Sequence, residues 1–122
     1  MRETELDTGG GGVLAGVTRT EVRSRPQDFE GQLLQWTLQY IAVPASDELR
    51  REIPAGSRYL LARGPIPERG FVYVILPDDR VAEVEALEPL AEITIIGRVR
   101  TARSHYLGNP ILELVDLMAN QH

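Results

Sequence analysis

The run QLLQWTLQYIAV at residues 32–43 constrains the fold of this chain more than any other feature. Large apolar side chains recur in it at every second position, namely Leu34, Trp36, Leu38 and Tyr40. Polar side chains, Gln35, Thr37 and Gln39, lie between them. Successive side chains of a strand point to opposite faces, so a period of two predicts a long antiparallel strand with one face in a core.

Four further segments predict strands. RYLLAR at 58–63 and FVYVIL at 71–76 flank the turn GPIPERG at 64–70 and predict a hairpin. FVYVIL is apolar on both faces, which indicates a central or covered strand. EITIIGRVRTARS at 92–104 predicts a fourth strand in which Gly97 marks a bend or bulge. ILELVDLM at 111–118 predicts the last strand, after a turn at 106–110.

Helical signals are short. Residues 18–29 predict an irregular helical turn, and the loop 44–57 has room for one helical turn at 47–51. After residue 77, Asp78 and Asp79 supply candidate N-cap oxygens, and apolar residues then recur at helical spacing. We therefore expect one helix of two to three turns, with its apolar side at Val81, Val84, Leu87 and Leu90.

The order of these elements is three strands, a helix and two strands. It predicts an all-β chain with one short helix, folded as a five-stranded Greek-key barrel of the OB (oligonucleotide/oligosaccharide-binding) type. One core is expected to hold Leu34, Trp36, Leu38, Ile93, Ile95, Val99, Leu112 and Leu114, with Val84 and Leu87 covering its end.

The chain of 122 residues is long enough for one hydrophobic core, which we place at residues 17–122. Residues 1–16 predict a flexible arm because a polar octapeptide is followed by four glycines. The glycines are Gly9, Gly10, Gly11 and Gly12, and we expect them to dock the arm to a partner.

Two segments resemble small bacterial OB domains related to the tRNA-anticodon-binding type. PQDFEGQLLQWTLQYIAV at 26–43 is similar to their entry into the first strand. VAEVEALEPLAEITIIGRVRTARSHYLGNPILELVDL at 81–117 is similar to their ending of helix, glycine-containing strand, turn and last strand. These motifs encode barrel closure, so the resemblance implies the fold. The layout is also similar to the starvation-inducible outer-membrane lipoprotein family, which implies export.

That lipoprotein family carries a lipid on a Cys, whereas this chain has no Cys. The N-terminal MRETELDT lacks the apolar core of a signal peptide, which indicates either a cytoplasmic protein or a mature form without its leader. A periplasmic location is our expectation, with a cytoplasmic one left open.

Catalysis is not expected. The absence of Cys removes thiolate chemistry and Cys-ligated metals. No serine lies in a nucleophile elbow, and His105 is expected to be a surface residue of a turn. Glu113, beside the strand with Arg98 and Arg100, is expected to form a cross-strand ion pair. We expect no metal and no cofactor.

The candidate binding residues combine positive charge and aromatic rings. Arg98, Arg100 and Arg103 lie on and after the fourth strand, and Tyr59 and Tyr73 lie on the second and third strands as stacking platforms. A net charge of −5 is the wrong sign for indiscriminate binding to phosphate backbones. The leading hypothesis is thus a non-enzymatic accessory module that docks to protein partners through its arm and barrel face. The alternative is a single-stranded nucleic-acid-binding domain that uses these arginines.

Overall fold

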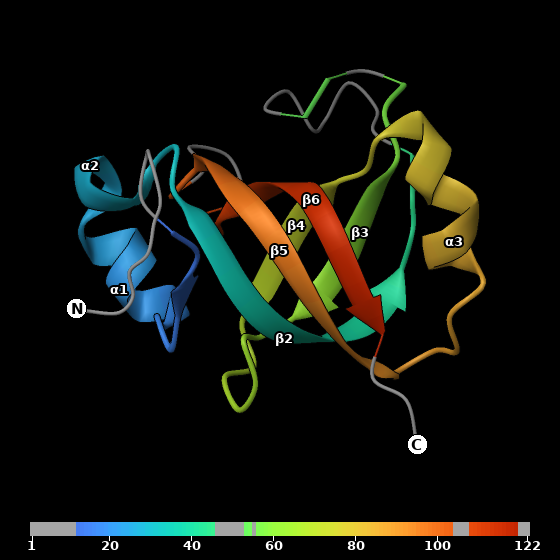
Figure 1. The fold of residues 1–122 in the computed structure, drawn as a ribbon, viewed down its shortest axis with the longest axis horizontal. Coiled ribbons are helices and arrows are strands. Elements are labelled where there is room, and N and C mark those ends of the chain that lie inside the picture. Colours follow the sequence, from blue (N-terminus) through green and yellow to red (C-terminus); the bar gives the residue numbers. More distant parts are fainter. Residues whose placement is uncertain (1–11, 46–52, 55, 104–107, 120–122) are drawn as a thin grey trace.

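The computed structural model of this chain describes residues 12–45, 53–54, 56–103 and 108–119. Its strands form a sheet in the order β1-β2-β3-β4-β6-β5, and a further pairing of β2 with β5 closes five of them into a barrel (Figure 1). The elements in chain order are β1 (Leu14–Ala15), α1 (Arg19–Ser24), α2 (Pro26–Phe29), β2 (Leu33–Ala42), β3 (Tyr59–Arg63), β4 (Phe71–Ile75), the 3-10 helix η1 (Asp78–Arg80), α3 (Val81–Glu85), β5 (Glu92–Thr101) and β6 (Ile111–Ala119).

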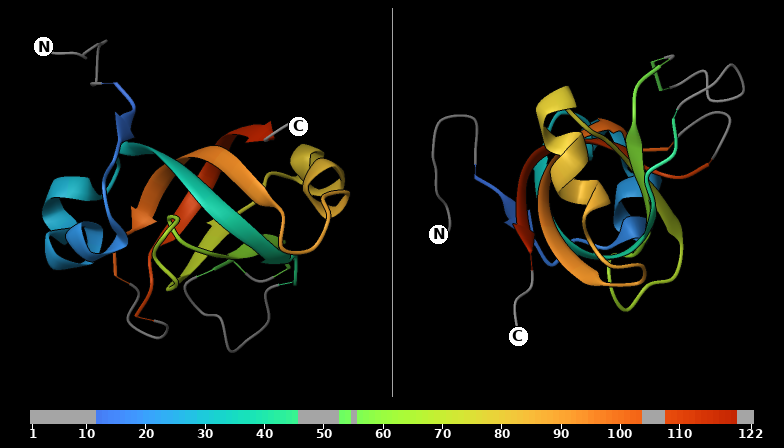
Figure 2. Two further views of the ribbon diagram at one scale, coloured as in Figure 1. Left: turned by 90° about the horizontal axis from the view of Figure 1, so that it is seen from below. Right: turned by 90° about the vertical axis from the view of Figure 1, so that its right-hand side faces the viewer.

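The predicted five-stranded barrel is confirmed. β2 pairs antiparallel with both β3 and β5, while β4 and β6 pair parallel, which completes the Greek-key path. Helix α3 lies at one end of the barrel, and helices α1 and α2 lie at the other end (Figures 1 and 2). This is the strand order and helix position of an OB-type barrel.

The barrel interior is the core that the alternating pattern predicts. Every second residue of β2 is buried from Leu34 to Tyr40, and the indole of Trp36 is only 2% exposed. All eight residues predicted to share a core belong to one buried cluster. Val84 of α3 belongs to it as well, and Leu87 packs against it, so the predicted cover over the barrel end is confirmed.

Gly97 sits where the barrel wall bends. The register between β5 and β6 shifts between Ile96 and Gly97, which confirms the predicted bulge. A Cβ atom at Gly97 would lie 2.8 Å from Cδ2 of Leu112, closer than carbon atoms approach. Glycine therefore permits the wall to bend against a filled interior.

A second, smaller cluster lies outside the barrel. Leu60 and Ala62 of β3 belong to the interior cluster, whereas the alternate residue Tyr59 points outward. The outward cluster is Ile53, Tyr59, Tyr73 and Ile111, with Leu61 and Ile75 packed against it. Part of the outer face of β3, β4 and β6 is thereby covered by the protein itself.

Two elements differ from the sequence prediction. The arm was expected to run to residue 16, but Leu14 and Ala15 form β1 and pair parallel with Leu34 and Gln35 of β2. A two-residue strand with exposed side chains carries no periodicity that could reveal it.

The helix after residue 77 begins as a 3-10 turn, and the predicted capping is wrong because the residue at its N-cap is Pro77, without a side-chain hydrogen bond. Leu90 lies beyond α3, is 62% exposed and has a positive φ of 67°, so it does not extend the helical face. The helical turn predicted at 47–51 lies outside the described residues.

Candidate nucleic-acid interface

A row of polar and aromatic side chains crosses the outer face where the β3–β4 hairpin turns. Gln39 of β2 is the register partner of Arg63, and Arg63 is the register partner of Phe71. The guanidinium of Arg63 lies 5.4 Å from the ring centroid of Phe71, which is a cation–π contact. Phe71 is 38% exposed, so this ring still offers surface to solvent.

A hollow of about 420 Å³ lies beside this row. It is lined by Gln39, Arg63, Ile66, Pro67, Glu68 and Arg69. Among the described residues, no carboxylate forms an ion pair with Arg63 or Arg69. The hollow therefore holds two guanidinium groups whose charges the described part of the chain does not neutralise.

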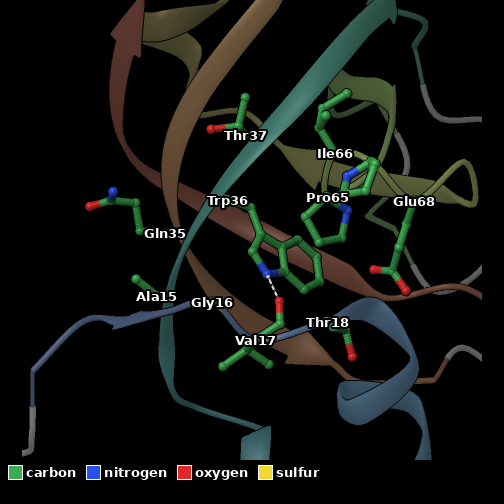
Figure 3. Close-up of a pocket in the computed structure, with 11 residues that line it drawn as sticks. Ala15, Gly16, Val17, Thr18, Gln35, Trp36, Thr37, Pro65, Ile66 and Glu68 are labelled. Atoms are coloured by element: carbon green, nitrogen blue, oxygen red, sulfur yellow. Dashed lines mark hydrogen bonds between the residues drawn. The ribbon is translucent and has the colours of Figure 1, made fainter.

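The one carboxylate that lines the hollow is already engaged. Oε1 of Glu68 accepts a 2.7 Å hydrogen bond from the backbone N–H of Arg19, and Oε2 lies 3.4 Å from the hydroxyl of Thr20. The Glu68 side chain accordingly points toward the start of α1, near Thr18 (Figure 3). This carboxylate is thus engaged by the first residues of α1 and forms no ion pair with Arg63 or Arg69.

The β3–β4 turn is held in place by backbone contacts. The N–H of Gly64 donates to the carbonyl oxygen of Gly70 at 2.9 Å, and the N–H of Ile66 donates to that of Thr37 in β2 at 2.8 Å. The peptide bonds preceding Pro65 and Pro67 are both cis. The two hydrogen bonds hold the turn beside the hollow.

Arg19 of α1 reaches the same turn. Its Nε donates to the carbonyl oxygen of Phe71 at 3.2 Å, and its NH2 group donates to the side chain of Asn109. Burial, and next the neighbouring charge of Arg23, lower the pKa of the Arg19 guanidinium. A Cβ atom at Gly70 would overlap this guanidinium, so a larger residue there would displace the end of the Arg19 side chain.

Helix α1 begins with a capping box that the sequence reasoning missed. The side chain of Thr18 accepts from the N–H of Glu21, and Glu21 accepts from the backbone N–H of Thr18 at 2.8 Å. That second hydrogen bond lowers the pKa of the Glu21 carboxyl. The spacing of Thr18 and Glu21 was the available signal.

A second hollow, of about 380 Å³, lies on the α1 side of the same turn (Figure 3). It is bounded by residues 15–18, by Gln35, Trp36 and Thr37 of β2, and by residues 65–68. The indole Nε1 of Trp36 donates a 2.7 Å hydrogen bond to the carbonyl oxygen of Val17. The indole N–H is thereby satisfied within the protein.

Both tyrosines predicted as stacking platforms are buried in the structure. Tyr59 is 2% exposed and Tyr73 is 7% exposed, and their rings meet edge to face with centroids 5.8 Å apart. They belong to the cluster with Ile53 and Ile111. Both rings are buried in this structure, so a stacking role for them stays a prediction.

The predicted arginines lie elsewhere on the outer surface. Arg98 donates to the carbonyl oxygen of Gly31 at 3.0 Å, and Arg100 forms a 2.9 Å ion pair with Glu113. The predicted cross-strand pairing of Glu113 is thus confirmed. Arg103 is exposed. Strand β6 separates β5, which carries Arg98 and Arg100, from β4, a spacing of roughly 10 Å at the usual distance between strands.

Of the four glycines predicted to dock the arm, Gly9, Gly10 and Gly11 lie outside the described residues, and Gly12 is half-buried. Their docking role stays a prediction. Within the described ranges no group of His, Cys, Asp and Glu side chains could hold a metal ion. None of the described helices has the length and apolar character needed to cross a membrane.

Sequence reasoning missed Arg63, Arg69 and Phe71. The signal was present in the hairpin, because Arg63 ends one predicted strand and Phe71 begins the next. In a hairpin these two positions lie opposite each other, and cross-strand neighbours interact directly. The prediction that FVYVIL is a central strand is confirmed, since β4 pairs with β3 and β6.

No family model and no curated protein matches the chain. Solved structures do match it. A candidate aspartyl-tRNA synthetase from Leishmania major Friedlin has a TM-score of 0.57 at 10% sequence identity, covering 97% of this chain and 22% of that chain. This chain therefore spans only a small part of the synthetase.

A candidate nucleic acid-binding lipoprotein from Klebsiella pneumoniae has a TM-score of 0.56 at 19% identity. The match covers 80% of this chain and 81% of that chain. Together with the closed five-stranded barrel, these likenesses define the class of protein: this chain has an OB-type fold. They bear out the fold that the resemblance in the sequence implied.

Proposed function

We propose that this protein is a non-catalytic module that binds single-stranded nucleic acid on the outer face at the β3–β4 turn. The observation that carries the proposal is the Arg63–Phe71 contact on an exposed surface. Proteins that bind single strands without sequence preference combine aromatic rings, on which bases stack, with positive charges that contact phosphates. Phe71 and Arg63 offer this combination. Both structural neighbours are consistent with this, since one is described as nucleic acid-binding and the other as a tRNA synthetase.

The acidic net charge of −5 lowers the expected affinity for nucleic acid. Repulsion from the rest of the surface weakens any indiscriminate attraction to phosphates. The arginine charges at the hollow form no ion pair with a carboxylate in the described part of the chain. They attract phosphates only over a short distance, because salt screens interactions between exposed charges beyond about 10 Å. Binding is therefore expected to be local, of modest affinity and dependent on Phe71.

Fluorescence anisotropy with labelled single-stranded RNA and DNA tests this proposal across a salt series. Phe71→Ala should weaken binding by about 1–3 kcal/mol, the usual contribution of one stacked base. Arg63→Ala should also reduce the slope of log K against log salt by about 0.7 for each phosphate that the protein no longer neutralises.

Arg25→Ala is the matched control. Arg25 also lies over a phenylalanine ring, 5.7 Å from the centroid of Phe29, but beside α2 and away from the hollow. Its replacement removes the same charge and the same kind of cation–π interaction. The proposed site would be contradicted if both arginine variants weakened binding equally, or if the affinity of the wild type did not change with salt concentration.

Docking of a protein partner is the second candidate function, and β1 is the observation that favours it. Val13 is 40% exposed and Leu14 is 38% exposed where the predicted arm joins the sheet. Deletion of residues 1–16 should then reduce co-purification of a partner from the source cells while the barrel stays folded. Unchanged co-purification would remove this candidate.

A further inference from the structure

We propose that the hollow beside Arg63 and Arg69 receives the terminal phosphate of a bound strand. This inference rests on the proposed function, and it places one end of the bound strand at the β3–β4 turn. The chemical group is a phosphomonoester, which the phosphodiesters within a strand do not provide.

Only some of the described arginines have a carboxylate partner, while Arg19, Arg23 and Arg98 donate to backbone carbonyl oxygens. Arg25, Arg58, Arg80 and Arg100 each form an ion pair with a carboxylate. Arg63 and Arg69 form none with any described residue, yet both line one hollow. Glu68 lines the same hollow, but its carboxylate is engaged by Arg19 and Thr20 and forms no ion pair with Arg63 or Arg69. The two guanidinium charges therefore create a local site for an anion.

The charge of the site matches a terminal phosphate better than an internal one. A phosphomonoester carries about −1.5 to −2 at pH 7, whereas a phosphodiester carries about −1. Guanidinium groups bind phosphate oxygens in pairs through their planar forks, so Arg63 and Arg69 can together meet several oxygens of one group. The amide of Gln39 lines the same hollow and adds an N–H donor.

The position of the hollow also favours the end of a strand. A base that stacks on Phe71 places its neighbouring phosphate toward Arg63, the register partner of Phe71. Beyond Arg63 lie Ile66 and Pro67 of the turn, which is fixed to β2 by the hydrogen bond from Ile66 to Thr37. A strand that runs from Phe71 over Arg63 therefore comes up against the turn at the hollow, and this favours an end of the strand there.

Three oligonucleotides of one sequence, each about six nucleotides long, test the proposal. They carry no terminal phosphate, a 5′-phosphate or a 3′-phosphate, and their affinities for the full chain are compared by anisotropy or calorimetry. We expect one phosphorylated form to bind about tenfold tighter than the unphosphorylated form. Excess inorganic phosphate should remove this advantage and leave the unphosphorylated oligonucleotide bound.

Substitutions then assign the advantage to the hollow. Arg69→Ala should abolish the preference for the phosphorylated end, while Phe71→Ala should weaken all three oligonucleotides by the same factor. Arg103→Ala is the control, because Arg103 is another exposed arginine with no described carboxylate partner, and it follows β5 and does not line the hollow. If Arg69→Ala proves unstable in thermal melting, Arg69→Gln provides the same comparison.

The outcomes separate the two proposals. Equal binding of all three oligonucleotides would overturn the terminal-phosphate site and leave the proposed function standing. A preference that survives Arg69→Ala would overturn the assignment to this hollow. A mononucleotide that binds as tightly as the phosphorylated oligonucleotide would show that the occupant is a free nucleotide and not a strand end. Binding of none of them would overturn both proposals.

Discussion

The indole nitrogen of Trp36 donates a 2.7 Å hydrogen bond to the carbonyl oxygen of Val17, and this bond connects the barrel to the segment that precedes α1. The ring of Trp36 fills the interior, while its one polar atom holds a backbone group of a different element. A buried indole N–H requires a partner of this kind. Trp36 therefore contributes to packing and to the placement of the N-terminal segment.

Substitutions at Trp36 should separate these contributions. Trp36→Ala should destabilise the protein by about 3–5 kcal/mol, as expected for a buried aromatic ring. Trp36→Phe keeps most of the packing and should cost about 1–3 kcal/mol, because the carbonyl of Val17 loses its donor. Urea unfolding curves measure both values. Equal costs for the two variants would mean that the hydrogen bond contributes most of the stabilisation.

Truncation of the N-terminus should have a stepwise effect. Removal of residues 1–12 should leave the free energy of unfolding unchanged, because glycines and polar residues bury little apolar surface. Removal of residues 1–16 also deletes β1 and should cost about 1–2 kcal/mol, the contribution of a few strand hydrogen bonds. Thermal melting of the two truncated proteins and the full chain tests this. A large loss on the first truncation would show that the arm itself is structural.

Reversal of charge on β5 should leave the barrel folded. Arg98 and Arg100 point away from the core, and the ion pair of Arg100 with Glu113 is 41% and 44% exposed at its two side chains. Arg98→Glu with Arg100→Glu should therefore cost about 1 kcal/mol or less for that pair. Circular dichroism and thermal melting check the fold.

The same two positions distinguish the sites on the outer face. Because Arg63 and Arg69 line the proposed interface, Arg98→Ala with Arg100→Ala should change oligonucleotide affinity by no more than about threefold. A complete loss of binding would instead show that the interface lies on β5, as the sequence alone predicted.

A methyl group added at Gly97 should strain the barrel. Gly97→Ala would place its Cβ 2.8 Å from Cδ2 and 3.2 Å from Cβ of Leu112, and overpacking of this kind costs about 1–3 kcal/mol. Leu112→Ala removes the clashing Cδ2 atom, so the double variant should be less destabilised than the sum of the two single variants. Additive losses in urea unfolding would contradict this cause.

The barrel could be predicted because its signals are local and repeated. The alternation around Trp36, the glycine within β5 and the turn between β3 and β4 each specify one strand and its limits. Their order then leaves few topologies. The helix start at Pro77 could not be predicted in the same way, since an aspartate near a helix can cap it or remain in solvent, and the choice depends on tertiary contacts.

The candidate site was harder to predict because it depends on which outward residues remain uncovered. Tyr59, Tyr73 and Phe71 all point out of the barrel, but Ile53 packs with the first two, and Phe71 lies beyond that cluster. Sequence period identifies the side of a strand and gives no information about what a distant segment places over it.

Helix α1 contacts two turns that are far apart in the sequence. The guanidinium of Arg19 donates to the carbonyl oxygen of Phe71 and to the side chain of Asn109, and its backbone N–H donates to Glu68. The side chain of Arg23 donates to the carbonyl oxygen of Gly108 at 2.8 Å. The β3–β4 turn and the end of the β5–β6 connection therefore share one support. If α1 detaches by local unfolding, both turns lose that support together. Amide hydrogens at these two places should then exchange with solvent at coupled rates, as one small cooperative unit within an otherwise slower barrel.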